Sequence, residues 1–154
     1  MEIERKFLLD YLPVNIDKFA KSEIIQAYIS YEPELRIRKK DDKYFMTKKI
    51  GTGMIRNEYE MEINEKFYNF LINGIDNKVS KTRYLVPLSS KTTAEIDVYH
   101  NNLDGLKTVE VEFETMEEAM NFEIPNWFSL EVTNDKNYKN ANLSKIKSYT
   151  KKKI

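Results

Sequence analysis

The chain begins with MEIERKF, residues Met1–Phe7, in which charged side chains recur at every second position. In a β-strand, alternate side chains point to opposite faces. Glu2, Glu4 and Lys6 would therefore share one face, and mostly apolar side chains would share the other. A row of two carboxylates and an ammonium at the start of a sheet raises the question of what these charges face.

The same alternation recurs along most of the chain. Strand-like patterns cover residues 2–10, 24–31, 34–40, 43–50, 54–63, 80–88, 93–100 and 107–114. Short polar turns separate them, which favours antiparallel neighbours. Helical spacing is confined to short stretches after Asn64, after Thr115 and from Asn140. The sequence predicts one mainly β (α+β) domain over residues 1–154, with about eight strands and a few flanking helices.

Composition excludes several classes of function. The chain of 154 residues contains no cysteine, so disulfides and thiolate metal sites are excluded. It has 25 basic and 25 acidic residues, and this balance argues against a nucleic-acid surface, which needs a basic excess. No apolar stretch is long enough to span a membrane. We expect a cytoplasmic protein with no nucleic-acid or membrane partner.

On the polar face of six of these strands, two neighbouring charges have the same sign. The pairs are Glu2 and Glu4, Arg36 and Arg38, Glu58 and Glu60, Lys81 and Arg83, Glu95 and Asp97, and Glu110 and Glu112. Lys6 and Lys48 are assigned to the same face, Lys48 with the parity of Met46. For a single strand, a face exposed to water explains such charges best. A wet sheet face, however, normally mixes signs, because like charges side by side repel.

The repulsion is small in water and large in a cavity. Charges two residues apart on a strand are separated by roughly 7 Å. They repel by about 0.6 kcal/mol in water and by about 2.4 kcal/mol at an effective dielectric near 20. Eight strands can close into a barrel that holds side chains or one small ligand. We therefore predict a closed tunnel with charges inside and apolar faces outside, whose charges are offset by a ligand.

Such a ligand would carry both types of charge. Divalent metal ions would satisfy the acidic strands, because hard cations bind several carboxylate oxygens. A polyanion would satisfy the basic strands, where arginine can bind phosphate through two hydrogen bonds. A metal ion bound to a short phosphate chain meets both requirements.

The motifs also resemble those of a known superfamily. EIERKF resembles the Glu-x-Glu-x-Lys signature of the CYTH, or triphosphate tunnel metalloenzyme, superfamily. Further similarity follows in the same order through QAYI, LRIRKK, MTKK, RNEYEMEI, KTRY, EIDVY, LKTVEVEFE and PNWFSLEVTNDKNYKN. The resemblance spans residues 2 to about 143 and implies an eight-stranded antiparallel tunnel. Asn137 and Ser129 depart from the superfamily's usual Arg and Gly, which affects contacts of the tail.

The resemblance also implies roles for individual residues. The metal is expected on Glu2, Glu4, Glu110, Glu112 and Asp97. The triphosphate is expected on Lys6, Arg36, Arg38, Lys48, Lys81 and Arg83. Catalytic roles are expected for Glu2, Glu4, Lys6, Glu58, Glu60 and Lys81, with no general base identified among them. Mg2+ or Mn2+ is the expected cofactor.

The expected function is metal-dependent hydrolysis of a short linear triphosphate, above all inorganic tripolyphosphate. Adenylate cyclase, thiamine triphosphatase and nucleoside triphosphatase activities remain alternatives, as does a non-catalytic polyphosphate-binding module. The expected partner is a small anionic triphosphate, and a homodimer is an open possibility. Tyr28, Tyr44 or Phe45 could stack on a base, although ordinary packing is favoured for each. His100 is expected to be a surface residue, and Trp127 to pack against the barrel.

Overall fold

The structure is a computed structural model that describes residues 1–51 and 54–149. Its strands are β1 (Glu2–Leu8), β2 (Ala20–Tyr31), β3 (Glu34–Lys40), β4 (Lys43–Ile50), β5 (Ile55–Ile63), β6 (Lys78–Pro87), β7 (Thr93–Tyr99) and β8 (Lys107–Phe113). Its helices are α1 (Glu65–Ile72), α2 (Met116–Met120) and α3 (Asn140–Leu143), with 3-10 turns η1 (Ile16–Lys18), η2 (Asn101–Leu103) and η3 (Lys136–Tyr138).

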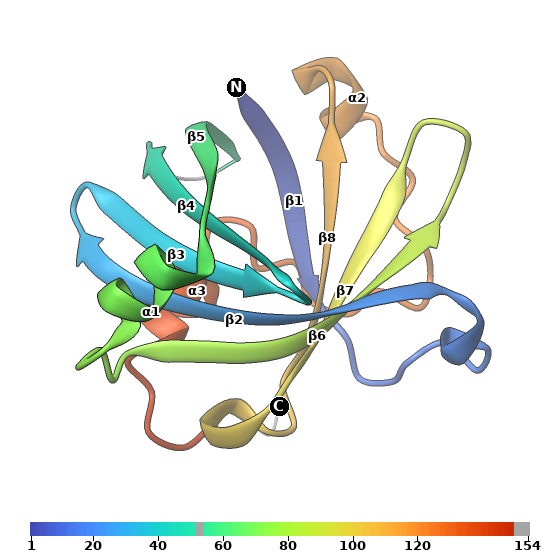
Figure 1. The fold of residues 1–154 in the computed structure, drawn as a ribbon. Helices are drawn as coiled ribbons and strands as arrows, with labels where there is room; N and C mark the ends of the chain where they lie inside the picture. Colours follow the sequence, from blue (N-terminus) through green and yellow to red (C-terminus); the bar gives the residue numbers. More distant parts are fainter. Residues whose placement is uncertain (52–53, 150–154) are drawn as a thin grey trace.

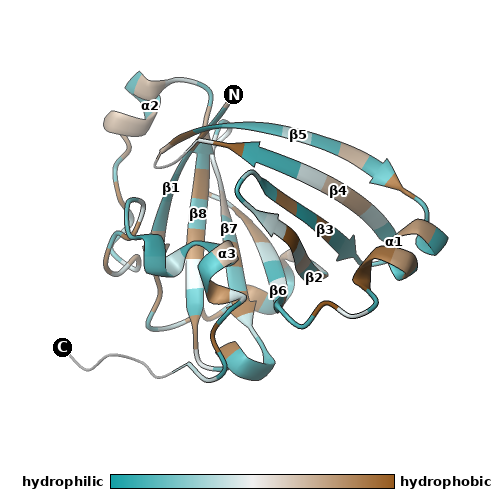
Figure 2. Cartoon of the chain, turned by 90° about the vertical axis from the view of Figure 1, so that its left-hand side faces the viewer, coloured by the Kyte–Doolittle hydropathy of each residue, from teal (hydrophilic) through white to brown (hydrophobic). Residues whose placement is uncertain are grey.

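The strands close into one antiparallel barrel in the order β1-β5-β4-β3-β2-β6-β7-β8 (Figure 1). The eight-stranded antiparallel tunnel predicted from the sequence is therefore confirmed. Hydrophilic and hydrophobic residues alternate along several of the strands (Figure 2), as expected when the two faces of a sheet meet different surroundings. No helix among the described residues is long and apolar enough to cross a membrane.

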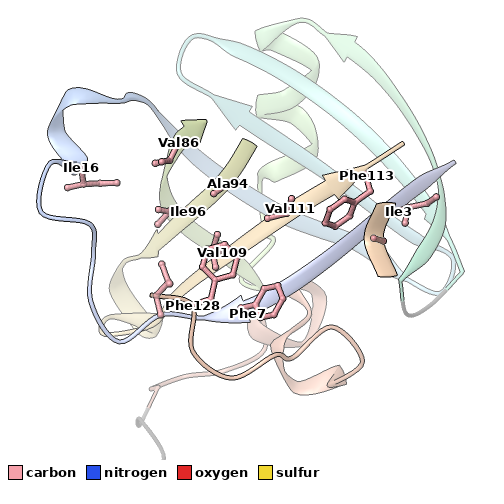
Figure 3. Packing of buried hydrophobic residues seen from close by; sticks show 12 residues of the cluster. Ile3, Phe7, Ile16, Val86, Ala94, Ile96, Val109, Val111, Phe113 and Phe128 are labelled. Atoms are coloured by element: carbon pink, nitrogen blue, oxygen red, sulfur yellow. The ribbon is translucent and has the colours of Figure 1, made fainter. Parts of the chain in front are cut away.

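The largest hydrophobic core lies outside the barrel, against β1, β7 and β8 (Figure 3). Phe7, Ile96, Val109 and Val111 project from these strands and are at most 1% exposed. The chain segments that follow β1 and β8 cover them, with the ring of Phe128 tilted by 51° against that of Phe7 at 5.0 Å between ring centroids. The predicted outward direction of the apolar faces is confirmed here, and Trp127 packs against the same core.

A second cluster covers the other side of the barrel. Tyr68 of α1 packs on Ala27 and Ile37, which point outward from β2 and β3. The helix begins where predicted, because the side chain of Asn64 accepts a hydrogen bond from the Phe67 N–H at 2.8 Å and caps the first turn. The outer sides of the barrel are thus covered unequally, since Tyr59 and Met61 of β5 remain 61% and 62% exposed.

One end of the tunnel is closed by apolar side chains, which we call the floor cluster. It comprises Val79, Tyr99, Leu103, Leu106 and Leu143, with Leu8, Tyr138, Ile146 and Tyr149 packed against it. The predicted tail helix contributes to this closure but is shorter than expected. It ends at Leu143: the N–H groups of Lys145 and Ile146 donate to carbonyls only three residues earlier, and further on the Tyr149 N–H donates to the Asn102 carbonyl at 2.8 Å.

Strands β1 and β5 pair over only two positions, Glu2 with Arg56 and Ile3 with Ile55. Beyond this point the edge of β1 is paired by a segment from the C-terminal part of the chain, residues 129–140, which we call the strap. The Ser129 N–H donates to the Leu8 carbonyl at 2.9 Å, and the Val132 N–H to the Lys6 carbonyl at 2.8 Å. The strap therefore completes the tunnel wall beside the signature strand.

Candidate active site

The interior of the tunnel is divided into two facing walls. Neighbouring strands β7, β8, β1 and β5 contribute most of the carboxylates, and we call them the acidic wall. Strands β4, β3, β2 and β6 contribute most of the cationic side chains, and we call them the basic wall. Because each wall consists of four consecutive strands in the barrel order, the like-charged strands of the sequence gather on opposite sides of one bore.

Three carboxylates of the acidic wall converge at one point. One oxygen each of Glu2, Glu4 and Glu112 lies within 4.8 Å of the others. Glu4 and Glu112 face each other directly across the β1–β8 pair. Three converging carboxylate oxygens form a donor set that suits a hard divalent cation. The predicted ligands Glu110 and Asp97 are not part of this group.

The surroundings of these carboxylates disfavour charge in the absence of a cation. Burial, followed by the nearby charge of Glu110, raises the pKa of Glu4 to about 8. Burial, followed by Glu95, raises the pKa of Glu112 to about 7. Both shifts come from desolvation and like-charge repulsion, which a bound cation would reverse.

Glu110 belongs to a different electrostatic environment. Burial alone would raise its pKa, but Lys6 and Arg83 outweigh burial and hold it well below the usual value. The Lys6 Nζ lies 3.6 Å from Glu110 Oε1. Glu110 is therefore an ionised counter-ion for cations of the bore.

Asp97 is held by two cations of β6. Its carboxylate accepts two hydrogen bonds from Arg83, at 2.8 and 3.0 Å, and Lys81 Nζ lies 2.9 Å from Oδ2. Although burial opposes the charge, Arg83 and Lys81 lower the pKa of Asp97. Burial has the larger effect on Lys81 and lowers its pKa to about 7, despite the attraction of Asp97.

Acidic and basic side chains also pair between β3 and β5. Arg36 lies 3.8 Å from Glu58, and Arg38 donates to Glu60 at 3.0 Å. Glu60 also accepts from Thr47 at 2.9 Å. The predicted inward direction of these four charged residues is confirmed, and each carboxylate has a cationic partner.

Several buried donors of the bore are nevertheless unsatisfied. The Nε atoms of Arg36, Arg38 and Arg56 are buried and have no hydrogen-bond partner among the described residues. The Nζ of Lys81 makes no well-directed hydrogen bond either, although it lies 2.9 Å from Asp97 Oδ2. Buried donors in folded proteins are nearly always paired, so a cluster without acceptors indicates a place for a ligand. The acceptor that these nitrogens lack would be an anion.

The sequence-based prediction for Lys48 is wrong. Lys48 pairs with Tyr59 on the outer side of the β4–β5 ladder and is exposed, whereas its neighbour Lys49 is buried. The error follows from the two-residue period of a strand, because Met46 packs outside the barrel and Lys48 shares its parity. Thr47 and Lys49 have the opposite parity, which would have identified Lys49.

Arg56 is an inward cation that the sequence reasoning missed. It faces Glu2 across the β1–β5 pair and donates a hydrogen bond to Glu4. The sequence does indicate this inward direction, because Arg56 has the same strand parity as Glu58 and Glu60 in RNEYEMEI. Burial alone would lower the pKa of Arg56, but the charges of Glu4, Glu2 and Glu110 outweigh burial and raise it.

Comparison with known proteins agrees with this geometry. An inorganic triphosphatase from Nitrosomonas europaea is 38% identical over 147 residues, covering 93% of this chain and 96% of that protein. An inorganic triphosphatase from Acetivibrio thermocellus is 33% identical over 153 residues, covering 94% and 93%. A crystal structure of an inorganic triphosphatase has a TM-score of 0.71 at 36% identity, covering 94% of each chain. No family model matches the chain.

The chain belongs to the CYTH, or triphosphate tunnel metalloenzyme, superfamily. The Glu-x-Glu-x-Lys motif of this superfamily is the start of β1, and the structure places its three charged side chains in the tunnel. The row of charges at the start of the sheet therefore faces the interior, opposite the basic wall.

The strap adds residues to the triphosphate tunnel that strand periodicity did not reveal. Besides the bond from the Val132 N–H to its carbonyl, Lys6 of the superfamily motif makes further contacts with the strap: Thr133 Oγ1 accepts from the Lys6 N–H at 3.0 Å and the Tyr138 carbonyl accepts from Lys6 Nζ at 2.5 Å. Lys139 lines the same cavity as Lys6 and Arg36. No hydrogen bond or ion pair joins the Lys139 side chain to another described residue.

The remaining candidates lie at the margins of the triphosphate tunnel. Tyr28 lines its cavity, but it is 4% exposed and stacks on Tyr31. Phe45 packs beside Arg38, whose guanidinium carbon lies 5.4 Å from the ring centroid. His100 lies outside the bore, where Nε2 shares a hydrogen bond with Thr82 at 2.7 Å. These contacts agree with the structural roles favoured from the sequence.

Proposed function

We propose that this protein is a hydrolase that cleaves a phosphoanhydride bond of a short linear triphosphate, inorganic tripolyphosphate, with the aid of a divalent metal ion. The observation that supports the proposal best is the set of buried Nε donors without acceptors on Arg36, Arg38 and Arg56, in the same bore as the converging carboxylates of Glu2, Glu4 and Glu112. A metal-bound triphosphate supplies acceptors to the first set and positive charge to the second. The names of the two relatives point to the same substrate class.

The cationic side chains would bind and orient the phosphate chain. Arg36 and Arg38 on β3, with Lys81 and Arg83 on β6, present donors from two positions on the basic wall. Lys6 and Lys49 add ammonium groups from β1 and β4. Such a cradle holds the substrate in line and stabilises the negative charge that spreads over the phosphoryl oxygens during transfer. Lys49 takes the place of Lys48 in this set.

Glu2, Glu4 and Glu112 would hold the metal ion, because their oxygens already converge. A divalent ion at this point would neutralise phosphoryl oxygens and lower the pKa of a bound water molecule. Mg2+ and Mn2+ both prefer oxygen ligands and are the ions we propose. Glu110 and Asp97 would act mainly as counter-ions of the cradle. Glu58 and Glu60 stay predicted catalytic residues.

The proposal is tested by measuring phosphate release from tripolyphosphate, ATP and thiamine triphosphate, each with Mg2+, Mn2+ or EDTA. We expect metal-dependent release from tripolyphosphate in preference to the two organic triphosphates, because most side chains that line the tunnel cavity are charged and suit phosphate better than a base. Conversion of ATP to cyclic AMP and pyrophosphate would instead show a cyclase. Tight binding of tripolyphosphate without turnover would show a binding module. A cytoplasmic location and a homodimer stay predictions.

A further inference from the structure

The carboxylates that converge for a metal ion already have cationic partners from the protein itself. Lys49 Nζ lies 3.2 Å from Glu2 Oε1, and Arg56 Nη2 lies 3.4 Å from the same oxygen. Arg56 Nη2 also donates to Glu4 Oε1. Two side chains of the protein therefore occupy positions around the oxygens that a metal would use.

These contacts lie in a largely dehydrated place. The side chains of Lys49, Glu2, Glu4 and Arg56 are between 8% and 13% exposed. A metal ion that binds these oxygens alone would repel both cations and take the carboxylates of Glu2 and Glu4 from them, which leaves Arg56 without its two ion-pair partners and Lys49 with Glu58 alone across the β4–β5 ladder. An uncompensated charge in such surroundings is strongly destabilising. Metal binding to the empty tunnel is therefore opposed by the protein's own cations.

A triphosphate would remove this opposition. Arg56 lines the same cavity as Lys6 and Arg36, and its Nε is one of the buried donors without an acceptor. A phosphate in this cavity would offer Arg56 a new anionic partner. A phosphate chain that extends toward Glu2 would offer the same to Lys49, which lies beside that carboxylate together with Arg56. Glu2 and Glu4 would then be free to bind the ion. Glu112 has no basic partner within ion-pair distance among the described residues, so it is available in either state.

We propose that Lys49 and Arg56 are internal counter-ions that exchange partners, from Glu2 and Glu4 in the empty tunnel to phosphate in the loaded tunnel. The exchange makes metal and triphosphate bind cooperatively, and it keeps the carboxylates from holding an ion without substrate. This inference rests on the proposed function, because it requires a triphosphate as the second ligand.

The test measures Mn2+ binding to the protein in the absence of any phosphate compound, from the electron paramagnetic resonance signal of free Mn2+ at fixed pH. We expect weak binding by the unchanged protein. Lys49→Gln and Arg56→Gln should each tighten it on the order of tenfold, between the small effect of an exposed pair and the much larger effect of a fully desolvated one. Thermal melting checks that each variant is folded.

Two control variants separate partner exchange from a general loss of positive charge. Lys48→Gln removes the same charge from the next residue of β4, on the outer face. Arg38→Gln removes a cation inside the bore whose partner is Glu60. We expect neither to tighten Mn2+ binding as Lys49→Gln does. Equal tightening by Arg38→Gln, or no tightening by either Lys49→Gln or Arg56→Gln, would overturn the exchange.

A second measurement completes the test with tripolyphosphate alone, in EDTA, by isothermal titration calorimetry. The same Lys49→Gln and Arg56→Gln variants should bind tripolyphosphate several-fold more weakly while they bind Mn2+ more tightly. Unchanged tripolyphosphate affinity in both variants would also overturn the exchange. A protein that binds no tripolyphosphate at all would instead overturn the proposed function, and the Mn2+ titration would still report separately on the ion pairs.

Discussion

The ammonium of Lys81 lies 2.9 Å from the carboxylate of Asp97, and neither side chain is more than 1% exposed. Tyr99 of the floor cluster packs beside this pair, with its ring centroid 5.6 Å from Lys81 Nζ. Arg83 donates two hydrogen bonds to the same carboxylate, so Lys81 shares its counter-ion with a second cation. Because Asp97 is shared with Arg83, it compensates the charge of Lys81 only in part, and a bound anion would stabilise the ammonium further.

This relationship predicts that tripolyphosphate binding takes up a proton. Lys81 has a pKa of about 7 in the empty tunnel, with burial as the main cause and with Asp97, Arg83 and Glu110 as the charged groups that face it. A bound phosphate favours the ammonium and raises this pKa. At a pH between the pKa of Lys81 in the free protein and its higher pKa in the complex, Lys81 is protonated in the complex and largely neutral in the free protein. The affinity therefore falls as pH rises above 7.

Calorimetry in two buffers of different ionisation enthalpy, at pH 7.5 and in EDTA, would measure this proton uptake. Lys81→Met should take up fewer protons than the unchanged protein, and its affinity should depend less on pH. Equal proton uptake by the two proteins would show that Lys81 stays in one protonation state. Other groups that titrate in the tunnel are present in both proteins, so the difference isolates Lys81.

Glu4→Gln should abolish metal-dependent hydrolysis, with a loss of about 100-fold or more in kcat, because the amide cannot replace a charged ligand oxygen. The melting temperature should change little. The substitution removes the charged contact with Arg56, which costs stability. It also removes a carboxylate whose charge is disfavoured by burial, which offsets this cost. Phosphate release and thermal melting measure the two effects.

Glu62→Gln is the matched control for this change, because Glu62 lies near the end of β5 and is exposed. It should retain the turnover of the unchanged protein. Normal turnover in Glu4→Gln would remove Glu4 from the metal site, whereas loss of folding would show that its role is structural.

The strap leads to a third prediction. Lys139 lines the cavity beside Arg56, and burial followed by the charge of Arg56 lowers its pKa. We expect Lys139→Gln to raise KM for tripolyphosphate about three- to tenfold with little change in kcat, as for a lost charge-assisted hydrogen bond. Lys136→Gln removes a charge from an exposed position three residues earlier and should change neither constant. Equal effects of the two changes in steady-state kinetics would mean that only the net charge of the strap matters.

Strand parity predicted much of this site, and its failures have identifiable causes. The alternation in EIERKF placed Glu2, Glu4 and Lys6 in the bore correctly, because a closed barrel gives each strand one inner and one outer face. The prediction for Lys48 failed because Lys48 was grouped with Met46, which points outward. In a strand, an error of one residue moves a side chain from the outer face to the inner face. Arg56 obeyed the parity rule but was overlooked among the three glutamates that follow it.

The strap could not be predicted in this way. Its contacts with Lys6 join residues more than 120 positions apart, through backbone groups of Val132 and Tyr138 that leave no pattern in the sequence. The shortened tail helix has a similar cause. Leu143, Ile146 and Tyr149 recur at helical spacing and do reach the floor cluster, but a tertiary hydrogen bond to Asn102 replaces the last helical turns. Periodicity therefore identified which side chains of the tail are packed against the floor cluster, but it did not predict the backbone conformation after Leu143.

The outer core gives a final prediction, on stability. Val109 and Val111 of β8 are fully buried outside the barrel, beneath Phe128 and the segment that contains it. An aspartate at either position would place a carboxylate among apolar side chains, which should destabilise the fold by more than about 3 kcal/mol. Valine to alanine at the same positions should cost roughly 1–3 kcal/mol through lost packing.

Urea unfolding of the four variants would measure these differences. Val109→Asp is the more stringent of the two aspartate variants, because Arg5 pairs with Val111 across the β1–β8 ladder and could partly neutralise a carboxylate there. Arg5 is already bonded to Glu131 at 2.6 and 2.8 Å, so this relief should be incomplete. We expect Val109→Asp to be unfolded or nearly so at 37 °C. A midpoint for Val109→Asp as high as that of Val109→Ala would mean that this face of β8 is accessible to water, contrary to an outer core packed around a charged tunnel.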